Sequence, residues 1–241
     1  MLRANHIEQG SCYTSTLTRK WLALRMLANS YRVLSGTTLL ERIDEIASTF
    51  GSTDKEQDRF LSIIWSLDSP TLDAARICIC FENFFKAELL LKGYIIHRID
   101  KAALTPTYRY LAADQKTRPI KITEIKLAEG LRWKRNNNYS FQTLTPFTIE
   151  FTLFLKEPSY KSKIRLPEGV FLALKRINTK RNMLHYLVGD GAVYDQQVIA
   201  ELQCVKRCFN DYLVMKHNRL LKELQFPDVH IKDPLWTSSD A

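Results

Sequence analysis

Two residues with chemically versatile side chains, Arg181 and His185, stand four positions apart in the segment PEGVFLALKRINTKRNMLHYLV, residues 167–188. Residues four apart share one face of an α-helix. An imidazole titrates near neutral pH, so it can take up or release a proton. A guanidinium can hold a phosphate and stabilise additional negative charge on it. Together the two side chains have the chemistry needed to bind a phosphate and move a proton beside it.

The segment that carries this pair is predicted to form one helix. Pro167 and Glu168 suit a first turn, and Gly189 can end the helix. At about 100° per residue, one apolar stripe runs along it, made of Val170, Leu174, Ile177, Leu184 and Val188. Arg181 and His185 interrupt that stripe. A permanent cation there is costly unless it meets a partner, a substrate anion or another subunit.

A second predicted helix begins after Ser69, which suits an N-cap, and extends to about Arg98. Its residues are apolar nearly all round, which is typical of a central helix. Glu88 and Lys92 lie four apart on its most apolar stripe and can pair with each other. Glu88 could instead hold Arg181. The simpler interpretation is a structural ion pair that fixes the packing.

Between these helices the sequence is less regular. Apolar and polar residues alternate briefly over residues 120–126, as they do in a strand. Residues 147–154 are ambiguous between a strand and a short helix. The stretch 131–141 mixes basic with aromatic side chains, which suits phosphates and unstacked bases, although a solvated basic loop has the same composition. The candidate RNA-binding residues here and in the basic stretch 161–165 are Arg132, Trp133, Lys134, Arg135, Tyr139, Lys161, Lys163 and Arg165.

The composition indicates a folded protein with an anionic partner. The chain has 241 residues, 45% of them hydrophobic, and a formal net charge of +9, which favours nucleic acid first and a membrane surface second. No apolar run reaches the roughly 18 residues of a membrane span, and the first residues lack an apolar core of signal-peptide type. We therefore expect a cytoplasmic protein without a membrane segment.

The cysteines do not form a metal-binding pattern. Cys204 and Cys208 share a helix face, but no nearby His or Cys completes a site, and Cys78 and Cys80 are two apart on a predicted helix. We therefore expect buried, reduced thiols, with neither a metal nor a cofactor.

In the rest of the chain, apolar residues recur at helical spacing, which predicts a mainly α fold. Further helices are expected over residues 16–35, 38–50, 55–67 and 194–224. The first should bury the residues that repeat at helical spacing, namely Leu17, Trp21, Leu24, Ala28, Tyr31 and Leu34.

The two central helices resemble those of the HEPN family of small helical-bundle proteins, over about residues 70–222. The early family motif, Glu-Leu-x-x-Lys-Ala/Gly-Tyr/Leu, is matched by Glu88, Leu89, Lys92, Gly93 and Tyr94. The later motif begins with Arg, commonly followed by Asn, and ends in His beside an aromatic residue. It is matched by Arg181, Asn182, His185 and Tyr186.

This chain departs from the family in one spacing. Three residues separate Arg181 from His185, whereas the family usually has four to six. Lys180 would restore the commoner spacing, but a lysine cannot make the planar two-point contact of an arginine.

The resemblance implies a HEPN-like bundle in residues 70–226, with an irregular, partly β insertion at about 100–165. Residues 1–69 would add N-terminal helices, and residues 227–241 would form a loose tail. The implied activity is metal-independent RNA cleavage by attack of a ribose 2′-hydroxyl. Arg181, His185 and Asn182 would be catalytic, and the supporting residues would be Glu88, Lys92, Lys180 and Tyr186.

Other family properties would follow. HEPN sites usually form across a homodimer, in which each subunit supplies one Arg–His pair. Many members are toxins of toxin–antitoxin pairs or antiviral defence effectors, so an antitoxin or another protein partner is implied. Two alternatives stay open. One is a non-catalytic member that binds RNA, a nucleotide or a protein. The other is an unrelated DNA-binding or scaffold protein in which Arg181 and His185 are satisfied core residues.

Overall fold

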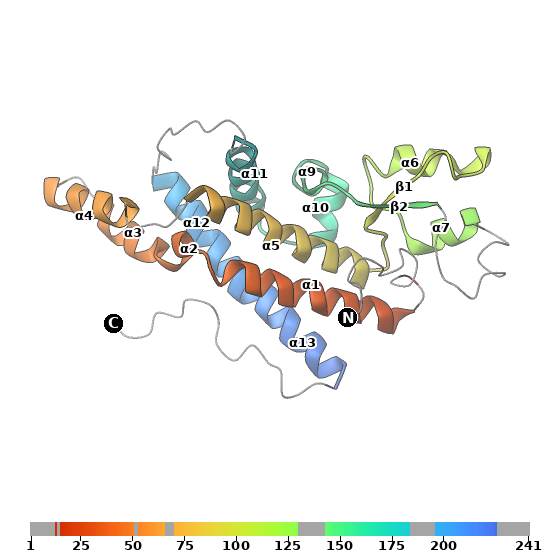
Figure 1. The fold of residues 1–241 in the computed structure, drawn as a ribbon, viewed down its shortest axis with the longest axis horizontal. Coiled ribbons are helices and arrows are strands. Elements are labelled where there is room, and N and C mark those ends of the chain that lie inside the picture. Colours follow the sequence, from red (N-terminus) through yellow and green to blue (C-terminus); the bar gives the residue numbers. More distant parts are fainter. Residues whose placement is uncertain are drawn as a thin grey trace, which may run out of the picture. The chain divides into compact units, whose positions relative to one another are not determined.

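The structure, a computed structural model, is mainly helical with one small two-stranded sheet (Figure 1), as the sequence predicts. It describes residues 13, 15–50, 53–65, 70–129, 143–183 and 196–225. None of the helices in these ranges is long and apolar enough to cross a membrane. The predicted tail, residues 227–241, lies outside them.

The chain divides into two compact units. Unit 1 comprises residues 1–26 and 84–165, and unit 2 comprises residues 27–83 and 166–241. Two of the three divisions fall inside helices, α1 (Thr16–Leu34) and α5 (Pro70–Leu91). The domain boundaries expected from the sequence, after residues 69 and 226, stay a prediction.

Unit 2 is entirely helical where it is described. Besides the C-terminal part of α1 and the N-terminal part of α5, it contains α2 (Thr38–Glu41), α3 (Ile43–Thr49), α4 (Asp54–Trp65), α11 (Glu168–Met183), α12 (Gln196–Cys208), the π-helical segment η4 (Phe209–Val214) and α13 (Met215–Glu223). The last three follow one another directly, which confirms the predicted long C-terminal helix.

Polar contacts fix how the helices of unit 2 pack. α12 contacts both α3 and α11. The Lys206 ammonium of α12 lies 2.5 Å from the Asp44 carboxylate of α3. On α5, the buried Asp73 carboxylate accepts hydrogen bonds from the Leu39 amide at 2.8 Å and the Thr38 hydroxyl at 3.1 Å. Asp73 thus satisfies backbone and side-chain donors at the start of α2 that would otherwise lack a partner.

Unit 1 combines short helices with a β-ribbon. Its elements after α5 are β1 (His97–Ile99), η2 (Pro106–Tyr108), α6 (Tyr110–Asp114), α7 (Ile122–Glu129), β2 (Leu144–Thr148), α9 (Phe151–Lys156) and α10 (Pro158–Ile164). The strands are antiparallel, with His97 opposite Thr148. Beside them, the Phe85 ring of α5 lies 5.5 Å from that of Phe154, centroid to centroid, and Phe154 lies at the same distance from Tyr160.

The central helix ends seven residues earlier than its apolar pattern predicts. α5 stops at Leu91, and Gly93 has a φ of 78°, the left-handed region that favours glycine. The Tyr94 amide then bonds back to the Leu89 carbonyl at 2.9 Å. The following residues are extended: the Ile95 amide donates to the Ile120 carbonyl at 3.0 Å. A continuous apolar pattern does not distinguish a buried helix from a helix followed by a buried strand.

Two further local predictions need correction, those for residues 120–126 and 38–50, and one ambiguous stretch is resolved. The stretch 120–126, which alternates briefly like a strand, lies mainly in helix α7, where Ile122 and Ile125 are buried one turn apart. The ambiguous stretch 147–154 contains both structures, because it begins in β2 and continues into α9. The helix predicted over residues 38–50 is also interrupted, since α2 and α3 are separated at Arg42.

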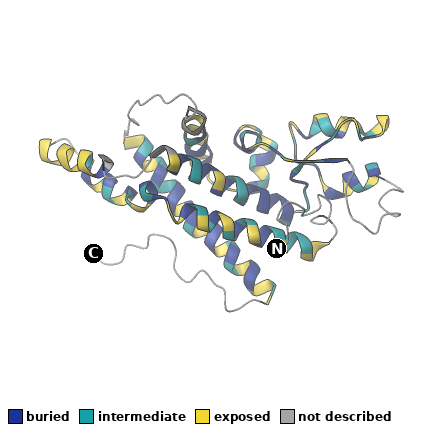
Figure 2. Ribbon diagram, viewed as in Figure 1, coloured by how far each residue is buried: buried dark blue, intermediate teal, exposed yellow. Residues whose placement is uncertain are grey.

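The buried face of α1 is rotated from the predicted one. Leu17 and Trp21 are 58% and 40% exposed, whereas Ala23 and Leu27 are fully buried. Leu24 and Leu34 are buried as predicted. The burial pattern of all helices is drawn in Figure 2. Because α1 carries apolar residues on more than one side, its periodicity alone did not select the face that packs.

We predict that Gly93→Ala destabilises the protein by about 1–2 kcal/mol, since an L-residue is strained at this φ. A Cβ at this position would meet nothing within 4 Å, so the cost should come from the backbone alone. Gly169→Ala, in the first turn of α11 and equally open, is the matched control and should be neutral or slightly stabilising. Urea unfolding of the three proteins measures both effects, and equal stability of the two variants would contradict the assignment.

Candidate functional site

The predicted helix over residues 167–188 is confirmed over residues 168–183, and its last part lies outside the described residues. α11 buries Val170 and Leu174 completely and includes Arg181 and Asn182 in its last turn. The structure does not describe the side chains of residues 180–183. His185 and Tyr186 lie outside the described residues, so the pairing of Arg181 with His185 stays a prediction.

One polar residue on the buried side of α11 was missed from the sequence. Asn178 is only 6% exposed, and its Oδ1 atom has no hydrogen-bond partner in the part of the chain that the structure describes. A buried amide oxygen without a donor is costly. Asn178 precedes Arg181 by three residues, one turn of helix. The signal was present in the sequence, because position 178 follows Leu174 of the predicted stripe by four residues and therefore shares its face.

α11 is attached to α12 by an ion pair. A guanidinium nitrogen of Arg176 lies 3.4 Å from a carboxylate oxygen of Glu201. The Arg176 side chain is half exposed, so the pair contributes little to stability by itself. The ion pair does help define how α11 and α12 face each other, since the two helices also pack against each other.

Glu88 and Lys92 form the ion pair that their spacing predicts. The Lys92 ammonium is 3.3 Å from a Glu88 carboxylate oxygen, and Glu88 is buried. Lys92 also donates to the Lys163 carbonyl near the end of α10. Both residues belong to unit 1, at the turn where α5 ends. Their evident role is to join that turn to α10.

The candidate RNA-binding residues fall into two groups. Arg132, Trp133, Lys134, Arg135 and Tyr139 lie outside the described residues. The basic residues of stretch 161–165 lie at the end of α10: Lys161 and Lys163 are half-buried, and Arg165 is exposed with a φ of 58°.

The chain on either side of stretch 130–142 is held together. Glu129, buried at the end of α7, accepts a hydrogen bond from the Thr143 amide at 3.0 Å and another from the Thr143 hydroxyl. Two bonds to one buried carboxylate oxygen fix the two ends of the stretch side by side. The end of α7 and the start of β2 are therefore held together at this point.

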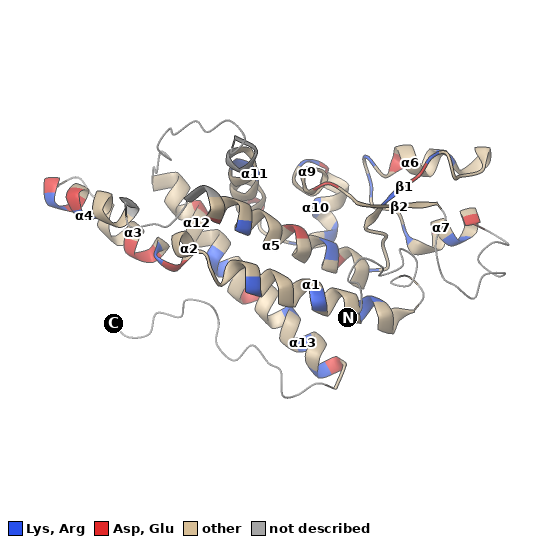
Figure 3. Ribbon diagram, in the orientation of Figure 1, with Lys and Arg blue, Asp and Glu red and all other residues tan. Residues whose placement is uncertain are grey.

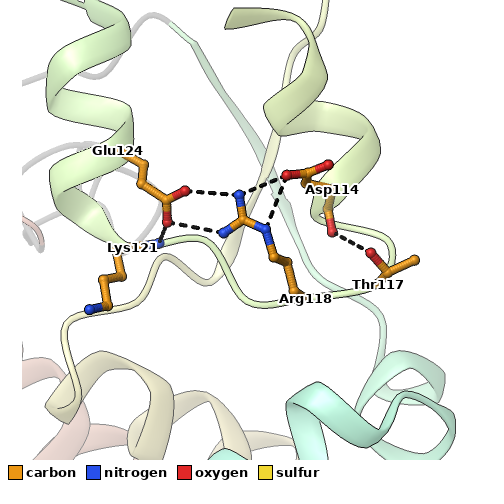
Figure 4. A network of polar contacts seen from close by, with 5 residues as sticks. All are labelled: Asp114, Thr117, Arg118, Lys121 and Glu124. Atoms are coloured by element: carbon orange, nitrogen blue, oxygen red, sulfur yellow. Dashed lines mark hydrogen bonds and ion pairs between the residues drawn. The ribbon is translucent and has the colours of Figure 1, made fainter.

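A second feature missed from the sequence is a network around Arg118 (Figure 4). Its guanidinium donates to the Asp114 carboxylate at 2.7 Å and to the Glu124 carboxylate at 2.9 Å. Hydrogen bonding to Glu124, with a further contribution from Asp114, raises the pKa of Arg118 above its ordinary value. Because both carboxylates hold it, this arginine is a structural cation that joins α6 to α7.

A buried polar cluster lies at the start of β1. The Tyr13 hydroxyl oxygen accepts hydrogen bonds from the Ile96 and His97 amides, at 2.9 and 3.2 Å. Since the amides can only donate, the hydroxyl proton is directed to Nδ1 of His97, 2.6 Å away. His97 is thereby held neutral. Burial, with a smaller contribution from the Lys86 charge, lowers the pKa of His97 to about 4.

The charges of the chain are divided unevenly between the two units. Unit 1 contains 20 Lys and Arg residues against 8 Asp and Glu, a net charge of +12. Unit 2 contains 15 against 18, a net charge of −3. The excess of positive charge that the sequence shows as +9 thus belongs entirely to unit 1. Figure 3 shows the described Lys and Arg positions in blue.

Neither metal binding nor reactive thiols emerge from the described residues. Within them, no group of three or more His, Cys, Asp or Glu side chains is placed to hold a metal ion. The four cysteines described are free thiols, three of them buried. Burial raises the pKa of Cys208 to about 12, so this thiol stays protonated and unreactive.

The chain was compared with family models, with curated proteins and with solved structures, and none of them matches it.

We predict that His97 makes stability depend on pH. In the unfolded chain a histidine titrates near pH 6.5, whereas folded His97 stays neutral down to about pH 4. The unfolded state therefore binds more protons between these values, and stability falls as the pH drops through this window. Wild type should lose about 2 kcal/mol more than His97→Gln between pH 7.5 and pH 5, measured by urea unfolding. An equal loss in both proteins would contradict the neutral, buried assignment.

Proposed function

We propose that the protein is a metal-independent endoribonuclease of HEPN type, with Arg181 and His185 as its catalytic pair. The observation that carries the proposal is the polar C-terminal half of α11. Asn178, buried on this helix, offers an acceptor one turn before Arg181. An arginine on such a face calls for an anion or a partner. A substrate phosphate, a second subunit, or both would meet that need.

The chemistry can be written from these residues. The ribose 2′-oxygen attacks the adjacent phosphorus while its proton passes to His185, and the bond from phosphorus to the 5′-oxygen breaks as that oxygen takes a proton from water, which the proton on His185 then replaces. The products carry a 2′,3′-cyclic phosphate and a 5′-hydroxyl. Arg181 stabilises the extra negative charge on the phosphate in the transition state. Asn182 positions the phosphate or Arg181, with Lys180 and Tyr186 in support.

A shared site between two copies would explain why a cation occupies an otherwise apolar stripe. In a homodimer each subunit would contribute one Arg181–His185 pair, and the stripe would form part of the interface. A toxin or antiviral defence effector, controlled by an antitoxin or another protein, is the corresponding biological role.

The division of charge favours one second candidate, a non-catalytic RNA-binding module. Binding a polyanion requires only the positive excess of unit 1, whereas cleavage requires in addition that Arg181 and His185 meet. The two candidates make the same prediction for RNA affinity and opposite predictions for cleavage.

RNA incubated with the protein in EDTA should be cut and should carry cyclic-phosphate ends. His185→Ala should slow cleavage by roughly 10²–10⁴-fold, the usual contribution of a general acid or base. Arg181→Ala should also abolish most of the activity. Lys175→Ala, an exposed position on the same helix, is the control and should cut at the wild-type rate.

Two outcomes would change the assignment. Cleavage at the wild-type rate by both His185→Ala and Arg181→Ala would remove these residues from the site. RNA bound but not cut by the wild type would select the binding module. The mass of the protein in solution, measured on the same samples, should be that of a dimer, and a monomer at micromolar concentration would contradict the shared site.

A further inference from the structure

The positive charge of unit 1 is not neutralised by its own acidic residues. Most of the acidic side chains described there serve internal contacts: Glu88 pairs with Lys92, Glu150 with Arg98, Asp114 and Glu124 share Arg118, and Glu129 holds Thr143. Among the described residues 101–129 and 143–165, six exposed basic side chains have no ion pair to another described residue: Lys101, Arg109, Lys116, Lys121, Lys156 and Arg165. These side chains are available to an anion.

Three of these cations, Arg109, Lys116 and Arg165, flank α6 and α10, which are joined to each other through Gln115. Gln115, just after α6, donates to the His97 carbonyl of β1 at 2.8 Å and accepts from the Ile99 amide at 2.9 Å. The Tyr160 hydroxyl of α10 donates to the Gln115 carbonyl at 2.7 Å. Lys116 follows Gln115 directly, so it lies where α6, β1 and α10 meet. Arg109, Lys116 and Arg165 are therefore carried by one connected framework.

Exposed aromatic side chains lie on the same framework. Tyr110, next to Arg109 in α6, is 53% exposed, and Phe147 in β2 is 67% exposed. α6 contacts β1, and β1 pairs with β2. Arg98, also exposed, donates to the Thr148 carbonyl beside Phe147 at 3.3 Å. A single exposed aromatic side chain needs no explanation. Two of them among cations without an ion pair suit a ligand that carries both negative charge and flat aromatic groups.

We propose that the surface formed by α6, the β1–β2 ribbon and α10 binds single-stranded nucleic acid. The cations contact phosphates, and unpaired bases stack on Tyr110 and Phe147. This combination of charge with exposed aromatic faces suits an unpaired strand better than a duplex, whose bases are already stacked. The inference extends the proposed function by naming where its substrate binds, but the binding does not depend on cleavage.

The test measures binding of a labelled oligo(dT) of about 20 nucleotides by fluorescence anisotropy, at salt concentrations from 50 to 200 mM. Oligo(dT) lacks the 2′-hydroxyl, so it cannot be cut by the proposed mechanism, and failure of the ribonuclease proposal leaves this test intact. The variant Arg109→Gln/Lys116→Gln/Arg165→Gln should weaken binding and reduce the slope of log K against log salt by about 2, at roughly 0.7 per lost phosphate contact.

A matched control removes the same charge from unit 2. Lys55, Arg59 and Lys175 are exposed there, and their joint replacement by Gln should leave the affinity within about twofold of wild type and the slope unchanged. Equal weakening by the two triple variants would overturn the proposal, because it would show that only net charge matters.

The aromatic contribution is tested separately. Phe147→Ala and Tyr110→Ala should each weaken oligo(dT) binding by roughly 5- to 150-fold, the fold-change that corresponds to loss of one stacked base. Tyr212→Ala, at an exposed tyrosine of unit 2, is the control and should bind as wild type does. Wild-type affinity in both unit 1 variants would overturn the stacking role. Binding to phosphatidylserine vesicles without binding to oligo(dT) would overturn the proposal in favour of a membrane surface.

Discussion

The turn at Gly93 is the constraint on which unit 1 depends. It stops α5 while the sequence is still apolar and sends the chain away as an extended segment. The Gly93 carbonyl then accepts the Ile122 amide at 3.0 Å, and the Ile96 carbonyl accepts the Ile149 amide at 2.8 Å. Two segments distant in sequence are thus brought to one short stretch after the turn. Any other residue at position 93 would be strained at this φ and would disfavour the turn.

The contacts around that turn also decide where charge is neutralised. Glu88 is held by Lys92 beside the turn, and Arg118 is held between α6 and α7. Carboxylates engaged in this way stabilise unit 1 but no longer compensate the cations on its surface. Unit 2 has the opposite balance, with a small negative excess. This division of charge is the reason why we propose polyanion binding for unit 1, while the proposed cleavage belongs to α11 of unit 2.

Much of the fold could be predicted from the sequence, because long amphipathic periods and caps are local signals. The helices α1, α4 and α11 and the helix from α12 to α13 were found in this way. The end of α5 was not, since Ile95 and Ile96 continue an apolar run whether the chain is helical or extended. Residues 120–126 were misread for a related reason: Ile120 and Ile122 alternate as in a strand, whereas Ile122 and Ile125 have helical spacing.

The polar contacts show more clearly what could not be predicted from the sequence. Glu88 and Lys92 could be paired from the sequence because they are one helical turn apart. Tyr13 and His97 could not, since 84 residues separate them and only the fold brings them together. The uneven division of charge was also hidden, because unit 1 is assembled from two separate ranges of the chain. A charge count along the sequence does not show which ranges of the chain fold together.

The most direct test of this account is photo-crosslinking of the intact protein to a single-stranded oligonucleotide that carries photoreactive uracils, followed by mass spectrometry of the linked peptides. Binding by unit 1 predicts crosslinks in peptides that contain Tyr110 or Phe147. Crosslinks confined to residues 38–65 of unit 2, with neither aromatic residue labelled, would contradict it.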